Sequence, residues 1–253
     1  MRTPAPEDNR LLAALPQDER DRIFPHLEPV LLRVGRTLHE GDRLAYAYFP
    51  ADAIISLFYE MKNGASAQTA VIGNDGMIGI ATLIGNTVSV VQPAVHVAGR
   101  AYKVRAAVLK AEFERHGPVH ALVLRYMQTL ATQIAQTAAC NRYHGIEQQV
   151  CRWLLLDLDR LPANHFRMTQ VMMSTALGVR REGVNMAAQR LQRDGIISYD
   201  RARITVLDRV ALESRACECY RMLQDELNRS PNPSEVLRPA DVTRAPPAVV
   251  ANP

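Results

Sequence analysis

The distribution of glycine divides the chain into two kinds of sequence. Nine of its 13 glycines lie between Gly35 and Gly117. The same stretch holds short apolar runs, at residues 54–59, 70–72 and 95–97. Short apolar runs separated by glycine-containing turns are typical of β-strands, and their regular recurrence favours a barrel or roll. We therefore expect a β-rich domain over 10–117, opening with one or two short helices.

From Pro118 to His144 the chain has no further glycine or proline, which favours one long helix starting at Pro118. Its apolar residues recur at steps of three and four. Such a stripe predicts a dimerisation helix over 118–144, and packing against the roll of the same chain is the alternative. The expected interface residues are Leu122, Tyr126, Leu130 and Ile134.

Gly145 separates this helix from a second predicted domain over 145–227. Its central segment, 168–191, has the spacing of a helix-turn-helix motif. Thr169 is a suitable N-cap and also a candidate DNA-binding residue, and Gly178 is a suitable helix end. After residue 227 the composition changes again, because 228–253 holds six of the 15 prolines and few large apolar side chains. We expect this last segment to be a flexible tail.

The second helix of the motif has one apolar face and one polar face, and the polar face has the residues for reading DNA. Arg181 suits a bidentate contact with guanine, and Glu182 can accept from cytosine N4. Arg180 has the charge for a phosphate contact. The other candidate base readers are Asn185 and Gln189 for adenine, and Met186 for a thymine methyl group.

Residues 194–207 predict a helix stop followed by a short hairpin, which is the pattern of a wing. Arg201 and Arg203 at its tip suit phosphate contacts. Between 145 and 215 the chain has 11 arginines, no lysine and eight acidic residues, a net charge of +3. Plain packing of two amphipathic helices is the alternative. The succession of capped helix, glycine turn, Arg-Arg-Glu helix and basic hairpin favours DNA binding.

With these residues in view, the chain resembles the Crp/Fnr family of bacterial transcription regulators over most of residues 10–225. The resemblance implies an α+β fold: an N-terminal cyclic-nucleotide-binding-like β-roll (a double-stranded β-helix), a long dimerisation helix and a C-terminal winged helix-turn-helix domain. The residues that carry it are Gly35, the Glu40-Gly41-Asp42 turn, Gly178, Arg181, Glu182, Val184, Leu191 and Gly195-Ile196-Ile197.

The resemblance also implies partners. It implies a homodimer that reads a palindromic site in double-stranded DNA through an Arg-Glu-x-x-x-Arg motif, with RNA polymerase as a further candidate partner. Arg181 and Glu182 match the motif, but its third reader position holds Met186 instead of arginine.

The effector site departs further from the family. Nucleotide-binding relatives hold the ribose with a Gly-Glu pair and the cyclic phosphate with an Arg-Ser or Arg-Thr pair. Here the stretches that align read Gly79-Ile80 and Gln92-Pro93. Without those polar anchors, cyclic AMP binding in the usual manner is not expected. The glycines of the turn remain, so two alternatives stay open. The roll binds an unknown small-molecule effector, or it binds none. The candidate pocket residues are Gly76, Gly79, Ile80 and Gln92.

Other function classes have little support in the sequence. No stretch suits a membrane span or a signal peptide, so we expect a cytoplasmic protein. No catalytic motif is present, and we expect neither an enzyme nor a cofactor. Residues 1–139 lack cysteine, which excludes the N-terminal iron-sulfur cluster of oxygen-sensing relatives. Cys217 and Cys219 would point apart on a helix, and His116 lies before the helix of His120. We therefore expect free thiols and no metal site.

Two alternative functions are also compatible with the sequence. One is a small-molecule-sensing module whose DNA binding is only its output. The other is a protein-interaction module that uses the winged helix as a docking surface.

Overall fold

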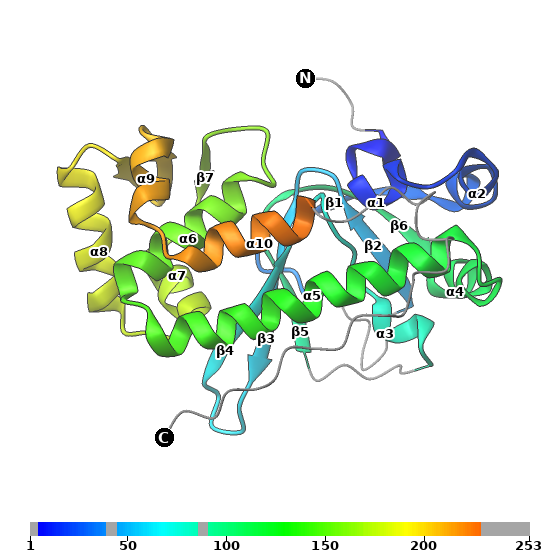
Figure 1. Ribbon diagram of the computed structural model, residues 1–253, viewed down its shortest axis with the longest axis horizontal. Helices are drawn as coiled ribbons and strands as arrows, with labels where there is room; N and C mark the ends of the chain where they lie inside the picture. Colours follow the sequence, from blue (N-terminus) through cyan, green and yellow to red (C-terminus); the bar gives the residue numbers. More distant parts are fainter. Residues whose placement is uncertain (1–4, 39–44, 86–90, 229–253) are drawn as a thin grey trace, which may run out of the picture.

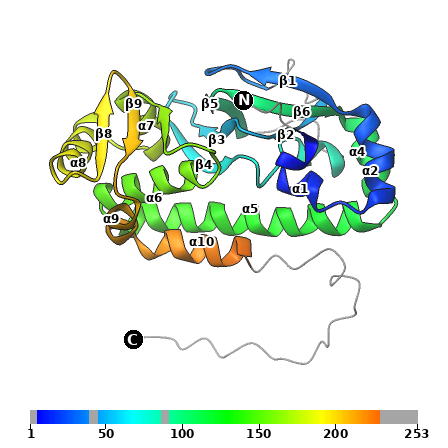
Figure 2. The same cartoon turned by 90° about the horizontal axis from the view of Figure 1, so that it is seen from above.

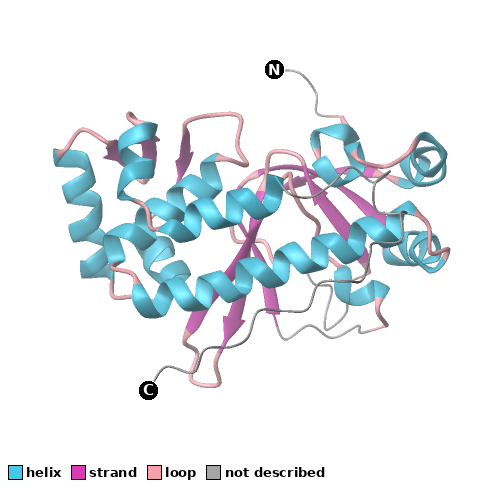
Figure 3. Cartoon of the chain, in the orientation of Figure 1, coloured by secondary structure: helices cyan, strands magenta, loops and turns pink. Residues whose placement is uncertain are grey.

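The computed structural model describes residues 5–38, 45–85 and 91–228. The Glu40-Gly41-Asp42 turn and the predicted tail after Asn228 lie outside these residues. The molecule is elongated, with a β-rich part at one end, a helical part at the other and one long helix running past both (Figure 1, Figure 2). Both helices and strands occur in each part (Figure 3). The predicted α+β class is confirmed.

The β-rich part consists of two antiparallel sheets of three strands each, in the orders β1-β6-β2 and β4-β3-β5. Residues of both sheets share one core, including Leu32, Ile55 and Val95, so the sheets pack face to face as the predicted roll. Its elements are η1 (Pro6–Asp8), α1 (Arg10–Ala13), α2 (Gln17–Ile23), η2 (Phe24–His26), β1 (Glu28–Leu32), β2 (Tyr46–Pro50), β3 (Ile54–Glu60), β4 (Ser66–Ile72), α3 (Ile80–Leu83), β5 (Val91–Val97), β6 (Gly99–Arg105) and α4 (Ala106–Glu114).

The long helix α5 (Pro118–Tyr143) begins at its predicted proline, where the missing N–H has no helical partner. Its N-terminal half packs on the roll. Val119, Val123 and Tyr126 are buried there. The Tyr126 hydroxyl donates to the Met77 carbonyl oxygen at 3.0 Å. A Cβ at Gly76 would lie 2.5 Å from that hydroxyl, so only glycine admits the ring this closely.

This packing buries part of the predicted dimer stripe within the chain. Tyr126 is only 8% exposed, and Leu122 and Leu130 are half-buried against the core of the same chain. Of the four predicted interface residues, Ile134 alone is exposed, at 39%. Within the chain, the roll covers this stripe over the first half of the helix.

The C-terminal part is a helical domain with a small sheet in the order β7-β9-β8. Helix α6 forms its centre and is buried over most of its length. Its elements are α6 (Ile146–Leu158), β7 (His165–Arg167), α7 (Gln170–Leu177), α8 (Arg181–Arg193), β8 (Ile197–Asp200), β9 (Arg203–Val206), α9 (Arg209–Arg215) and α10 (Glu218–Asn228). In the described part of the chain, no helix combines the length and apolar character that crossing a membrane requires.

The two parts share one hydrophobic core. Ile54 and Val71 of the roll belong to the same buried cluster as Trp153 and Leu154 of α6. Helix α7 lies against β4, and a Cβ at Gly178 would sit 3.4 Å from that of Ala67. The roll and the helical domain therefore hold a fixed relative position in this structure.

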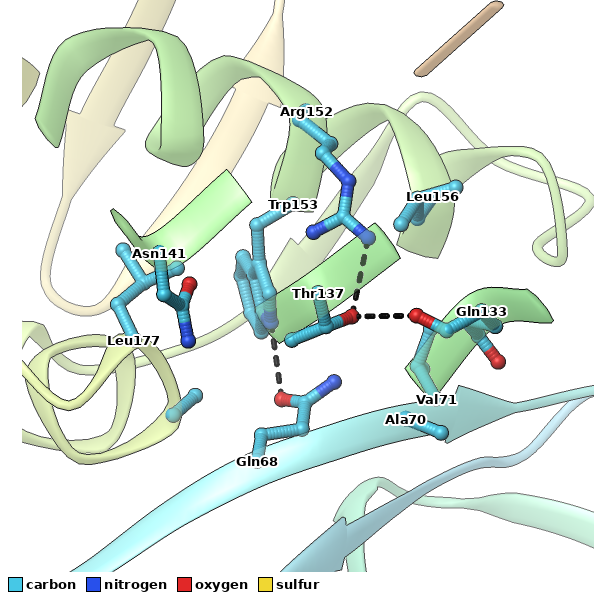
Figure 4. Close-up of a pocket in the computed structure, with 11 residues that line it drawn as sticks. Gln68, Ala70, Val71, Gln133, Thr137, Asn141, Arg152, Trp153, Leu156 and Leu177 are labelled. Carbon is cyan, nitrogen blue, oxygen red and sulfur yellow. Dashed lines mark hydrogen bonds between the residues drawn. The ribbon is translucent and has the colours of Figure 1, made fainter. Parts of the chain in front are cut away.

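A buried polar network crosses the same boundary. Nδ1 of His96 lies 2.7 Å from the Ser56 hydroxyl, and Nε2 of His96 lies 2.9 Å from the Asp157 carboxylate. The Ser56 hydroxyl donates to the side-chain oxygen of Gln68 at 3.1 Å. The Trp153 indole donates to the same oxygen at 3.0 Å (Figure 4). The Ser-His-Asp sequence of contacts resembles a hydrolase triad, but all three residues are buried. The network connects β3, β4 and β5 to α6.

Candidate nucleic-acid interface

The helix-turn-helix begins with the predicted capping interactions. The Thr169 hydroxyl accepts from the Met172 backbone N–H at 3.1 Å, so Thr169 is the N-cap of α7. Gly178 ends the helix with φ of 65°, a conformation that favours glycine. The chain then turns through Val179 and begins α8 at Arg181. These local signals set the angle between the two helices.

Helix α8 buries its small and branched residues and exposes its polar ones, as predicted. Val184 and Leu191 are fully buried, and Ala187 and Ala188 between them let α8 approach α6 and α7 closely. The opposite face carries the exposed side chains Arg181, Glu182, Met186 and Gln189. Met186 is 55% exposed, a large apolar group with no covering partner in the described chain. In Figure 1, α8 lies at the end of the molecule away from the roll.

Asn185 differs from the other predicted readers. Its side-chain oxygen accepts from the Gln170 amide at 2.9 Å, and the residue is half-buried. The bond joins the start of α7 to the first half of α8. Asn185 is therefore engaged within the motif, and Gln170 is a residue of this interface that sequence reasoning missed. Nothing in the spacing of 170 and 185 indicates the contact, since it depends on how the two helices cross.

Arg180 occupies the N-cap position of α8, with an extended backbone and an exposed side chain. It therefore lies just outside the helix whose exposed face holds Arg181 and Glu182. This place suits the predicted phosphate contact better than a base contact, because a side chain at the helix entrance lies toward the edge of a groove that α8 would enter.

The predicted wing is present as β8 and β9. Arg201 and Ala202 form its tip with φ of 45° and 63°, so two residues without glycine's freedom adopt the left-handed conformation of a tight hairpin turn. The tip is held by the Met168 N–H, which donates to the Ala202 carbonyl oxygen at 2.7 Å. Arg201 and Arg203 are both exposed, which suits the predicted phosphate contacts.

A third arginine of the wing was missed by sequence reasoning. Arg167 is exposed on β7 and pairs directly with Arg203 of β9 in the antiparallel register. Like charges facing each other across a sheet are destabilising, so this pair suits an anionic partner. The only sequence signal was the basic residue itself, because a strand of three residues gives no periodic pattern.

The predicted effector residues occupy separate places in the roll. Gly76 is buried beneath Tyr126, and Gly79 precedes α3 with a left-handed backbone. Ile80 packs against the core, whereas Gln92 is exposed on β5 opposite Phe58. No described contact joins these residues into a pocket.

The pocket in Figure 4 lies elsewhere, between β4 and helices α5, α6 and α7. Arg152 donates to the Thr137 hydroxyl at 3.1 Å within it, and Thr137 donates to the Gln133 carbonyl oxygen at 2.8 Å. Its volume of about 20 Å³ has room for a single water molecule. The cavity is therefore a packing gap at the boundary between the two parts and is too small for an effector.

The comparisons with known proteins agree with this geometry. Residues 148–215 match the family described as the Crp-like helix-turn-helix domain. This segment of the chain is therefore similar to Crp-like helix-turn-helix domains. It includes α7, α8 and both wing strands, and therefore every predicted DNA-binding residue. A search of curated proteins gave no match.

Solved structures extend the likeness beyond the Crp-like domain. A transcriptional regulator of the Crp/Fnr family from Eubacterium rectale is 16% identical, with a TM-score of 0.63 over 83% of this chain and 98% of its own. FixK2 from Bradyrhizobium japonicum is 14% identical, with a TM-score of 0.62 over 76% and 98%. The c-di-GMP responsive regulator CLP from Xanthomonas campestris is 13% identical, with a TM-score of 0.59 over 76% and 99%. The chain thus has the Crp/Fnr fold, and the predicted resemblance is confirmed.

Proposed function

We propose that the chain is a sequence-specific DNA-binding transcription regulator that acts as a homodimer. The observation that carries the proposal is the exposed face of α8 in a Crp-like domain. There Arg181, Glu182, Met186 and Gln189 share one side of a helix whose other side is fully packed. A recognition helix enters the major groove with such a face, and its N-terminal residues reach the base edges.

The roles of the exposed residues follow from their chemistry. Arg181 reads guanine and Glu182 accepts from cytosine, while Met186 contacts a thymine methyl group. Around this helix, Arg180, Arg201, Arg203 and Arg167 contact phosphates on either side of the groove. Phosphate contacts fix the register of the protein on the duplex, and the α8 contacts select the sequence.

The dimer interface is assigned to the exposed face of α5. Six exposed residues recur there at alternating steps of four and three, which is the repeat of a two-stranded coiled coil. They are Leu124, Gln128, Ala131, Ala135, Ala138 and Arg142. Ile134 lies beside this row. Helix α10 packs on the other side of α5, near Gln133 and Cys140, so it leaves the row free for a second copy. The small alanines allow close approach of two such helices.

We also propose that the roll does not bind cyclic AMP in the usual manner. Where relatives that bind the nucleotide present a carboxylate, Ile80 packs its side chain against the roll core. Gln92 brings no positive charge to the place where those relatives have the arginine of an Arg-Ser or Arg-Thr pair. A thermal-shift measurement with cyclic nucleotides tests this, since a ligand at 100 times its Kd stabilises by about 2.7 kcal/mol.

Arg181→Ala is expected to weaken binding to the preferred site by about 1 to 3 kcal/mol and to relax one base position in each half-site. The cause is the loss of a bidentate pair with guanine. The measurement is a fluorescence anisotropy titration with the preferred duplex and a scrambled duplex, at one fixed salt concentration. Arg221→Ala, which removes an exposed arginine of α10, is the matched control. Equal weakening on both duplexes would show that Arg181 does not read a base.

Arg201→Ala is expected to weaken both duplexes to a similar degree, because a phosphate contact has no sequence information. The slope of log K against log salt should also fall by about one charge. The same titration repeated at several salt concentrations gives this slope. An unchanged slope would place the tip of the wing away from the DNA.

A further inference from the structure

Three cysteines and a histidine meet where the end of α5 faces the start of α10. The sulfur atoms of Cys140, Cys217 and Cys219 and a ring nitrogen of His144 all lie within 4.8 Å of one another. Sγ of Cys140 is 3.5 Å from Sγ of Cys217, and Sγ of Cys219 is 3.6 Å from Nδ1 of His144. The three cysteines form a small buried cluster of their own, apart from the main cores. These four groups have no part in the proposed DNA contacts.

The helix boundaries bring these residues together. The sequence alone led us to expect that Cys217 and Cys219 would point apart on one helix. Cys217 lies before α10, which begins at Glu218, whereas Cys219 lies in its first turn. The two thiols therefore do not stand two positions apart on one helix and can face the same point. On the other side, Cys140 is in the last turn of α5, and His144 caps that helix with an extended backbone. Cys140 and His144 at the end of α5 therefore face Cys217 and Cys219 at the start of α10.

The distances fit one tetrahedral metal ion. A Zn²⁺ ion with Zn–S bonds of about 2.3 Å holds its sulfur ligands about 3.8 Å apart. The Cys140 and Cys217 sulfur atoms, 3.5 Å apart, are close to this edge length. The 3.6 Å between Sγ of Cys219 and Nδ1 of His144 agrees with one Zn–S bond and one shorter Zn–N bond of about 2.0 to 2.1 Å. Three thiolates and one imidazole are a ligand set of structural zinc sites, in which the protein fills all four positions.

A second feature points to a ligand at Nδ1 of His144. Nε2 of the same ring lies 3.2 Å from the carboxylate of Glu218. A histidine that binds a metal almost always donates its other ring N–H to such a group, which fixes the tautomer and orients the ring. Here the carboxylate comes from the residue between the two cysteines. Glu218 is well exposed, with 70% of its side chain accessible, so it orients the histidine from outside the cluster.

We propose that Cys140, His144, Cys217 and Cys219 bind one Zn²⁺ ion that fastens α10 to the end of α5. Binding releases the protons of the thiols that become thiolates. The ion closes a loop from Cys140 to Cys219 that contains the whole helix-turn-helix motif and its wing. The ion thereby fixes the junction between α5 and α6, where the DNA-binding part meets the long helix. The site is structural, because no coordination position remains for a substrate.

The test uses Co²⁺ as a spectroscopic substitute for zinc in the full chain, stripped of metal with a chelator under reducing conditions. We expect one equivalent of Co²⁺ to produce the absorption of tetrahedral cobalt together with a thiolate-to-cobalt charge-transfer band. Zn²⁺ should abolish both bands by displacement. Weak absorption typical of octahedral cobalt, or no saturation at one equivalent, would overturn the proposal.

Three variants test the site: one removes a proposed ligand, one changes a cysteine outside the cluster, and one changes the carboxylate beside His144. Cys219→Ser should lose the tetrahedral spectrum, and Cys151→Ala, which changes a buried cysteine outside the cluster, should keep it. Glu218→Gln alters only an exposed residue and should lower the Co²⁺ affinity by about 10- to 100-fold while the far-UV circular dichroism stays unchanged. Equal Co²⁺ affinity in the wild type, Cys219→Ser and Glu218→Gln would contradict the assignment.

Discussion

Replacing Asp157 with alanine is expected to lower the free energy of unfolding by about 1 to 3 kcal/mol, the cost of leaving a buried hydrogen-bonding group without its partner. Asp157 is fully buried on α6 and accepts from Nε2 of His96 at 2.9 Å. Its loss leaves the imidazole without that partner in an apolar surrounding. The effect should be large because His96 lies on the roll and Asp157 on the helical domain, within a core that both parts share.

Urea denaturation followed by circular dichroism measures this change, with all proteins at the same concentration because a dimer's stability depends on it. Asp225→Ala, an exposed change on α10, is the control and should stay within about 0.5 kcal/mol of the wild type. Asp157→Asn, which keeps the shape and a hydrogen-bonding group, should fall between the two. A loss below about 1 kcal/mol in Asp157→Ala would mean that the network contributes little to holding the two parts together.

Ala135→Arg is expected to separate the proposed dimer and to lower the affinity for a full palindromic site by about 10²- to 10⁴-fold. In a two-fold interface the same face meets itself, so the new charges would stand opposite each other. The loss follows because the second recognition helix no longer benefits from the binding of the first. Affinity for a single half-site should stay close to that of the wild type, since α8 is unchanged.

Sedimentation velocity measures the oligomeric state, and anisotropy with full-site and half-site duplexes measures the affinity. Val210→Arg introduces the same charge at an exposed apolar residue of α9 and should remain dimeric. If Ala135→Arg sediments as a dimer and binds the full site normally, the exposed face of α5 is not the interface.

The parts of this fold that could be predicted from sequence depend on local signals. Thr169 and Gly178 mark the ends of α7 because a cap and a left-handed glycine act within a few residues. Pro118 marks the start of α5 for the same reason. The two faces of α8 follow from helical spacing alone. These features were sufficient to predict the winged helix-turn-helix and the face that it exposes.

The features that were missed depend on which segments meet in three dimensions. The stripe on α5 shows that one side is buried, but its spacing does not say whether the cover is the roll or a second chain. Tyr126 faces the roll because the turn at Gly76 is open enough to accept its ring. The bond between Gln170 and Asn185 depends on the crossing of two helices. The direction of the Cys217 thiol depends on where α10 begins, because the helix starts one residue later, at Glu218.

Selection from randomised duplex DNA, at a salt concentration near 0.15 M, tests whether the chain reads a palindromic DNA site as a dimer. The purified chain is incubated with the pool, and the bound fraction is sequenced. We expect a two-fold-symmetric motif with half-site centres about 34 Å apart, one turn of the duplex, because two α8 helices enter successive major grooves. An enriched motif without symmetry would contradict the dimer, and no enriched motif at all would contradict the reading of DNA by α8.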